Sequence, residues 1–190
     1  MYSKKRKVRR ILLFEICLQK IILEEHFPIK SGQTFGTNTD GLVFDDSISS
    51  DLTFTHYLNG LLTRTDANGL ETYEFFYYSP HVSPPKIRSN FHGNESFPQS
   101  SEYEFIGKGE KIERVEGVIV NATIRDSNGV SITKSFITSL RFISNQGVDN
   151  PYGYSTGVNF NESFPGYYLG YVTGRAEQYI EQLKFFWYRA

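Results

Sequence analysis

The sequence predicts an all-β domain that follows a helical N-terminal extension, and three observations support this fold class. Aromatic residues are abundant, with 16 Phe and 13 Tyr against one Met, and aromatic and β-branched side chains favour strands. Most of the chain consists of short runs that alternate polar and apolar residues. Asn-Gly occurs three times between or within such runs, and it favours hairpins because a type I′ turn needs positive φ at both central positions.

Composition excludes several classes of protein. The formal net charge is −1, so no overall field attracts nucleic acid, and no nucleic-acid partner is expected. Cys17 is the single cysteine, which excludes an intrachain disulfide. No run of 18 apolar residues occurs, so no transmembrane helix is predicted. Neither a metal nor a cofactor is expected, because no phosphate-binding Gly-rich loop is present and the histidines lack metal-ligand spacing: His26, His56, His81 and His92.

Residues 1–31 are predicted to form a basic, helical extension. The run "KKRKVRR" is followed by apolar residues on one helical face, with no Gly or Pro among them: Ile11, Phe14, Leu18, Ile21 and Ile22. The basic run fits a solvated arm, the first part of a secretion signal, a nuclear import signal, or an arm that contacts anionic lipid. Localisation therefore stays open between secreted and cytoplasmic.

The chain after residue 31 is predicted to begin with a loop and to continue as strands. The Gly-, Thr- and Asn-rich stretch 31–41 has no periodicity, which indicates a loop. Residues 51–58 alternate, as a strand does, with Leu52, Phe54 and His56 on one face. Turns are predicted at 59–60 and 68–69, where Asn-Gly separates this run from "LLTRT" and "ETYEFFYY".

The middle stretch 79–101 is predicted to be a long loop. It holds four of the seven prolines, and proline is excluded from the interior of a sheet. At most one short strand, near Ile87, is expected within it. Connections of this length in a compact domain are functional or mobile.

The second half is predicted to contain two hairpins. Asn128-Gly129 joins residues 118–125 to 130–142, where Phe136, Leu140 and Phe142 share one face. The stretch "YVTGRAEQYIEQLKFFW" (171–187) has helical spacing, yet β-branched and aromatic runs flank its centre. We predict strand, loop and strand, with Trp187 in the core.

Five motifs together resemble the jacalin-related lectins over residues 32–190. They are "GLVFDD" (41–46), "GKGEKIERVEG" (107–117), "ITSLRFISNQG" (137–147), "NPYGYSTGVNF" (150–160) and "YYLGYVTGRAEQYIEQL" (167–183). The resemblance implies a jacalin-type lectin domain at 32–190, folded as a β-prism I of three four-stranded Greek-key antiparallel sheets. It also implies a monosaccharide site at one end, formed by the loop before the first strand and the last inter-strand loop.

The implied carbohydrate-binding residues are Gly41, Glu177, Gln178, Tyr179 and Glu181. The family's last loop reads Gly-x-x-x-Asp, and here Glu177 and Glu181 replace its two ends. If the family's glycine needs positive φ, Glu177 is strained or the loop refolds. Glu181 keeps the carboxylate with one more methylene. Tyr179 either stacks on a sugar or packs in the core, and Asp45 and Asp46 are expected to bond loop amides.

The leading hypothesis is a carbohydrate-binding lectin that recognises a monosaccharide or a glycan end, with glycans or glycoproteins as partners. The alternative is a protein-interaction module on a lectin fold that has lost sugar binding. The chain is not expected to be an enzyme, because two carboxylates at an exposed tip have no cleft that would raise a pKa. Assembly into a homo-oligomer is left open.

Overall fold

The structure is a computed structural model that describes residues 29–37, 41–66, 71–96, 99–104, 110–125, 128–147, 152–153 and 156–190. Of residues 99–104 only the backbone is described. Residues 1–28 of the predicted helical extension, 1–31, lie outside the described residues, and the prediction is wrong for 29–31, which begin a strand that pairs with the last strand of the chain. No helix in the described part is long and apolar enough to cross a membrane.

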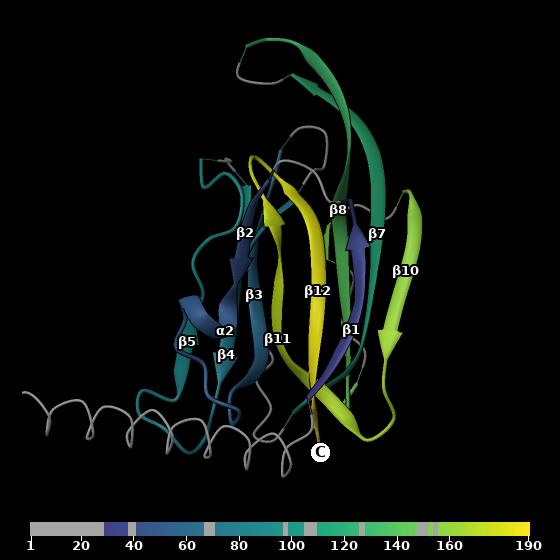
Figure 1. Cartoon of the computed structure of the whole chain (residues 1–190). Coiled ribbons are helices and arrows are strands. Elements are labelled where there is room, and N and C mark those ends of the chain that lie inside the picture. The colour runs from purple at the N-terminus through teal and green to yellow at the C-terminus, as the bar shows by residue number, and fades with distance from the viewer. Residues whose placement is uncertain are drawn as a thin grey trace, which may run out of the picture.

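Three antiparallel sheets of four strands each form the fold (Figure 1). The first contains, in spatial order, β1 (Ile29–Gly36), β12 (Ile180–Arg189), β11 (Tyr167–Ala176) and β2 (Leu42–Asp45). The second contains β10 (Val158–Ser163), β7 (Ile112–Arg125), β8 (Ser131–Ser144) and β9 (Tyr152–Gly153). The third contains β5 (Lys86–Arg88), β4 (Glu71–Tyr78), β3 (Tyr57–Thr65) and β6 (Gln99–Glu104), and the short helix α2 (Asp46–Ser49) follows β2.

Each sheet is a Greek key, as predicted. In the second sheet the order β10-β7-β8-β9 places a central hairpin between the two strands that follow it in sequence. The third sheet repeats this order with β3 and β4 at its centre. The first sheet repeats it with the two last strands, β11 and β12, at the centre and the two first strands, β1 and β2, outside. Both ends of the described chain therefore belong to one sheet.

The core lies between the three sheets and contains side chains from all of them. Phe75 of β4, Phe142 of β8 and Phe185 of β12 are completely buried, and Trp187 is buried beside them. The indole Nε1–H of Trp187 donates to Glu162 Oε1 at 2.7 Å, which satisfies a donor that would otherwise be buried without a partner. The predicted core position of Trp187 is confirmed.

Three local predictions are wrong. Asn59-Gly60 is no turn: β3 runs through it, and the pairing with β4 shifts between Leu58 and Gly60, so one extra residue forms a β-bulge. Residues 31–36 are no loop, because β1 pairs with β12 there. Residues 51–56 form no strand, since β3 begins at Tyr57.

Other local predictions are confirmed. β5 is the short strand expected near Ile87, although the predicted loop 79–101 ends early, because β6 already begins at Gln99. β7 and β8 form the hairpin expected around Asn128-Gly129, and Gly129 has φ of 78°. β11 and β12 form the strand, loop and strand expected for 171–187.

The β7–β8 hairpin is the longest in the described part, with 14 residues in each strand. It extends past the tip formed by β11 and β12 (Figure 1). Its alternation places Asn121 and Thr123 on the exposed face. The opposite face, which includes Ala122 and its partner Lys134, is turned toward the tip. This hairpin brings side chains of the second sheet to the end of the first.

Candidate functional site

The predicted site lies at the tip of the β11–β12 hairpin, where three residues, Glu177–Tyr179, connect the strands. The pairing shifts from Arg175↔Gln182 to Ala176↔Ile180, so Glu181 is an extra residue of β12 that faces no pairing partner on β11. Such a bulge redirects side chains. Ile180 and Glu181 are consequently both buried. Glu181 was predicted in the loop but belongs to β12.

Glu181 is the central carboxylate of the tip and is only 1% exposed. Its Oε2 accepts the backbone N–H of Gly41 at 3.2 Å. Its Oε1 accepts from Lys134 Nζ at 2.9 Å. A buried carboxylate without such partners would be strongly unfavourable, so these two contacts explain why a charged group is stable here.

Lys134 reaches the tip from β8 of the neighbouring sheet. Its Nζ lies between two carboxylates, 2.9 Å from Glu181 Oε1 and 3.3 Å from Glu177 Oε2. Burial lowers the pKa of Lys134, but the hydrogen bonds and charges of Glu181 and Glu177 outweigh it and raise that pKa above its ordinary value. The ammonium is therefore charged at neutral pH and balances Glu181.

Gly41 lies directly before β2 and faces the same carboxylate. Its carbonyl oxygen accepts from Arg175 Nη1 at 3.1 Å, so both backbone polar groups of Gly41 are held by the tip. A Cβ at this position would lie 2.9 Å from Glu181 Oε2 and 3.2 Å from backbone atoms of Ala176. Any side chain here would force Glu181 to move, so this close approach favours glycine, whereas the φ of Gly41, which is not positive, does not.

Glu177 and Gln178 form the exposed part of the loop. The Glu177 side chain is 64% exposed. Its backbone is not in the left-handed region, since Asp51 is the one non-glycine residue with positive φ in the described part of the chain. Replacement of the family's loop glycine thus causes no strain at Glu177. The Gln178 carbonyl oxygen accepts from Asn94 N–H at 3.1 Å, which connects the loop to the segment after β5.

Tyr179 is buried and offers no ring face for stacking on a sugar. It packs edge-to-face on Phe136, with ring centroids 5.2 Å apart. Its hydroxyl donates to Asp66 Oδ2 at 3.0 Å, and burial, together with Asp66, raises the pKa of Tyr179 to about 12. Of the two roles considered for Tyr179, the geometry fits the packing role.

Asp45 and Asp46 both have structural roles, but among the described residues only the Asp45 carboxylate bonds a backbone amide, as was expected of both; Asp46 bonds side chains. Asp45 caps α2 by accepting the Ser47 N–H at 2.9 Å. Asp46 is fully buried and accepts from Tyr77 Oη at 2.5 Å, while its Oδ1 lies 2.8 Å from His92 Nε2. This network fixes the chain that follows Gly41 and β2.

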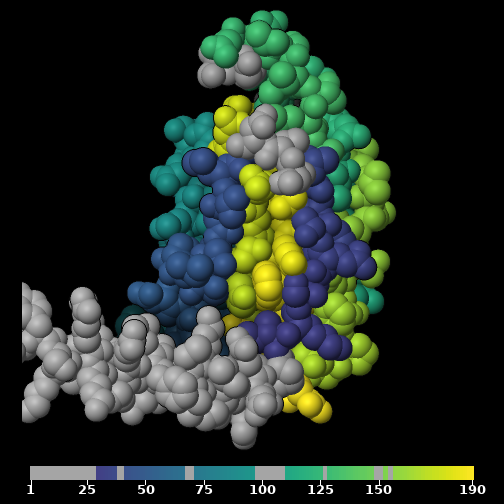
Figure 2. Space-filling view, viewed as in Figure 1, coloured from purple at the N-terminus to yellow at the C-terminus, as the bar shows by residue number. Residues whose placement is uncertain are grey.

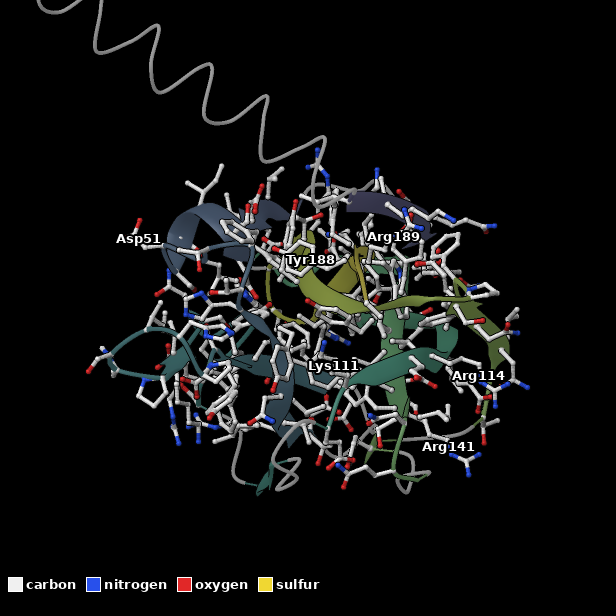
Figure 3. All side chains as sticks on the ribbon, turned by 90° about the horizontal axis from the view of Figure 1, so that it is seen from below. Asp51, Lys111, Arg114, Arg141, Tyr188 and Arg189 are labelled. Carbon is white, nitrogen blue, oxygen red and sulfur yellow. The ribbon has the colours of Figure 1, made fainter. Side chains whose placement is uncertain are left out.

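The opposite end of the prism carries a different surface (Figure 3). Lys111 and Arg114 line an open depression of about 680 Å³ there, together with Tyr167 and Tyr168. None of the predicted site residues lines it. Among the described residues, no group of three His, Cys, Asp or Glu side chains could hold a metal ion.

Two residues of the tip were missed by sequence reasoning. Arg175 belongs to a quoted motif, but nothing in the motif indicates its bond to Gly41. Lys134 carries a weak signal, since it shares a strand face with Ile132 and Phe136, where an apolar residue is usual. That signal does not indicate which carboxylate pairs with it.

Comparisons with known proteins agree with this architecture. A family model described as the jacalin-like lectin domain matches residues 32–186. A comparison with curated proteins gives no match. The structure resembles AcmJRL, a mannose-binding jacalin-related lectin from Ananas comosus, with a TM-score of 0.64 and 19% identity over 85% of this chain and 99% of that chain.

Two further solved structures have the same fold. The artocarpin–mannotriose complex gives a TM-score of 0.63 and 17% identity over 83% of this chain and 96% of that chain. A mannose-specific jacalin-related lectin from Morus nigra, in complex with mannose, gives a TM-score of 0.59 and 17% identity over 83% of this chain and 93% of that chain. Membership of a lectin family agrees with the prediction that the chain is not an enzyme. With its three Greek-key sheets and a family match over most of its length, the chain belongs to the jacalin-like lectin family.

Proposed function

We propose that the protein binds a monosaccharide or a glycan end at the β11–β12 tip, through Gly41, Glu181 and the loop Glu177–Gln178. The observation that carries this proposal is the Glu181 carboxylate beside the Gly41 amide, at the end of the prism that the family resemblance implies. Tyr179 anchors the loop by packing on Phe136 of β8.

The chemistry of the tip suits hydroxyl groups. Both oxygens of the Glu181 carboxylate accept hydrogen bonds, from Gly41 and from Lys134, and sugar hydroxyls are donors of the kind that such oxygens bind. Bonds from hydroxyls to an ionised acceptor are stronger than neutral ones. Lys134 and Glu181 balance each other's charge, which favours a neutral sugar over an anionic one. Mannose is the first candidate, because AcmJRL is described as mannose-binding and the Morus nigra lectin as mannose-specific.

An NMR titration with methyl α-D-mannopyranoside tests the proposal. We expect amide shift changes at Gly41 and at residues 177–181, and none at the opposite end around Lys111. The variant Glu181→Gln keeps the shape but loses the charge, and we expect its affinity to fall at least about tenfold. The absence of shifts at the tip, with no binding on an array of neutral glycans, would refute the proposal.

A second candidate is a protein-interaction module, and two observations favour it. Glu181 is 1% exposed, so its acceptor sites are covered in this structure. The edge strand β2, which begins beside the tip, exposes Leu42 and Val43 by 80 and 68%, and helix α2 after it exposes Ile48 by 75%.

Sedimentation measurements separate the two candidates. Self-association that depends on concentration and disappears in Leu42→Glu, together with an array that detects no glycan, would favour the interaction module. A protein that stays monomeric and binds the mannoside would remove this candidate and leave carbohydrate binding.

A further inference from the structure

We infer that Lys134 is an internal occupant of the carbohydrate site: its ammonium blocks the buried Glu181 and shifts to the exposed Glu177 when a sugar binds. This inference rests on the proposed function, since it describes how the same site opens. It makes Lys134 and Glu177 determinants of affinity, although Lys134 lies in a different sheet.

The position of the ammonium is the first argument. The Lys134 side chain is only 8% exposed, and Nζ donates to Glu181 Oε1 at 2.9 Å. An ammonium group is a pure donor, as a sugar hydroxyl is when it bonds to a carboxylate. Lys134 therefore fills the place from which a hydroxyl would reach this oxygen. It belongs to the β7–β8 hairpin, which projects beyond this end of the molecule in Figure 2.

The second carboxylate is the second argument. Glu177 Oε2 lies 3.3 Å from the same Nζ, and the Glu177 side chain is exposed while that of Glu181 is buried. Because a lysine side chain is long and flexible, the ammonium can turn outward to Glu177 without losing an ionic partner. A sugar that displaces Lys134 from Glu181 thus leaves no unpaired buried cation.

The sequence change in the loop fits this arrangement. The family resemblance implies a glycine at position 177, and a glycine would give Lys134 no acceptor outside the site. The neighbouring cation, Arg175, donates to the carbonyl oxygen of Gly41. Gly41 in turn bonds the Oε2 atom of Glu181, whereas Lys134 bonds Oε1. Among the described residues, the ionic contacts of Lys134 are those with Glu181 and Glu177.

Two substitutions with opposite effects test the inference. Lys134→Met keeps an unbranched apolar stem but removes the ammonium, so we expect methyl α-D-mannopyranoside to bind about tenfold more tightly. Glu177→Gln removes the ionic partner outside the site, so we expect binding to be about tenfold weaker. Lys111→Met, at the opposite end (Figure 3), is the matched control and should leave affinity unchanged.

The double variant Lys134→Met/Glu177→Gln separates an effect through the lysine from direct contact with the sugar. If Glu177 acts only by holding the ammonium, Glu177→Gln has no further effect once Lys134 is replaced. If Glu177→Gln costs as much affinity in the double variant as it does alone, Glu177 does not act through the lysine, and the inference is overturned.

Folding controls keep the test decisive. Lys134→Met removes the ammonium that bonds the buried Glu181, so its fold is checked by circular dichroism. Should it not fold, Lys134→Arg replaces it: the planar guanidinium forms several bonds to carboxylates, so we expect it to hold Glu181 more firmly and to weaken binding. Unchanged affinity in the folded Met variant, or in the Arg variant that stands in for it, overturns the inference.

The results also distinguish the two proposals. Binding by both proteins, tighter in Lys134→Met than in the wild type, supports the inference and the proposed function together. A wild type that binds, with unchanged or weaker binding in Lys134→Met, overturns only the role of the lysine. The absence of binding in both folded proteins overturns carbohydrate binding at the tip as well.

Discussion

Replacement of Gly41 by alanine tests the packing of the tip directly. The new methyl group would lie 2.9 Å from Glu181 Oε2 and 3.2 Å from two backbone atoms of Ala176. The backbone of Ala176 is held in the β11–β12 pairing, so the Glu181 side chain has to move. Because the Gly41 N–H donates to the same oxygen at 3.2 Å, the movement also weakens that hydrogen bond.

The expected loss of stability follows from these two effects. Adding a methyl group to a well-packed site costs about 1–3 kcal/mol, and a weakened bond to a charged acceptor adds about 1 kcal/mol. We expect the free energy of unfolding to fall by about 2–4 kcal/mol, which for a chain of this size lowers Tm by roughly 2–4 °C per kcal/mol.

Urea unfolding followed by tryptophan fluorescence measures this change. Trp187 is the one tryptophan in the chain, and it is completely buried, so its emission reports loss of the core. Gly147→Ala is the matched control, because a Cβ there meets no atom within 4 Å and its φ is not positive. A Gly41→Ala protein as stable as the Gly147→Ala protein would refute the close contact between Gly41 and Glu181.

Three further predictions concern the neighbourhood of the tip. Tyr179→Phe removes one hydrogen bond and should cost about 1 kcal/mol in thermal unfolding, with unchanged mannoside affinity; a loss of affinity would mean that Tyr179 contacts the sugar. Burial raises the pKa of Glu71 to about 8, from 4.5 in the unfolded chain, so the folded state binds more protons between these values and stability falls as pH rises through that window. Glu71→Gln should lack this fall, which reaches about 1.4 kcal/mol per pH unit, and equal slopes in urea titrations at several pH values would contradict the raised pKa. Asp46→Ala leaves Tyr77 and His92 without their buried partner and should cost about 3 kcal/mol by urea unfolding, whereas a neutral result would show that the network is dispensable.

Local patterns in the sequence were sufficient for much of the fold. The runs on both sides of residues 177–179 predicted β11 and β12, although the spacing of their apolar residues also fitted a helix. The strand prediction was preferred because both runs are rich in β-branched and aromatic side chains, which favour strands. Asn128-Gly129 predicted the β7–β8 hairpin, since Gly129 does adopt the positive φ that the turn needs. Five motifs in order predicted the family.

Local patterns failed where pairing decided the conformation. Asn59-Gly60 has the same signal as Asn128-Gly129, yet β3 continues through it as a bulge because Leu58 and Gly60 both pair with β4. The stretch 31–36 has no strand pattern, but β12 offers it a pairing edge. Hydrogen bonds to a neighbouring strand stabilise both segments in ways that their own residues do not indicate.

Local periodicity and motif order were enough to predict the class of fold, the family and the positions of Gly41, Glu177 and Glu181 in a candidate site. The partners of Glu181 could not be predicted in this way, because they depend on the tertiary structure. Lys134 is 47 residues away along the chain and belongs to another sheet. A β-bulge turns Glu181 inward, and the β7–β8 hairpin brings the lysine to the same place. Periodicity specifies which face of a strand is buried, whereas the meeting of two strand ends depends on how whole sheets close around a common core.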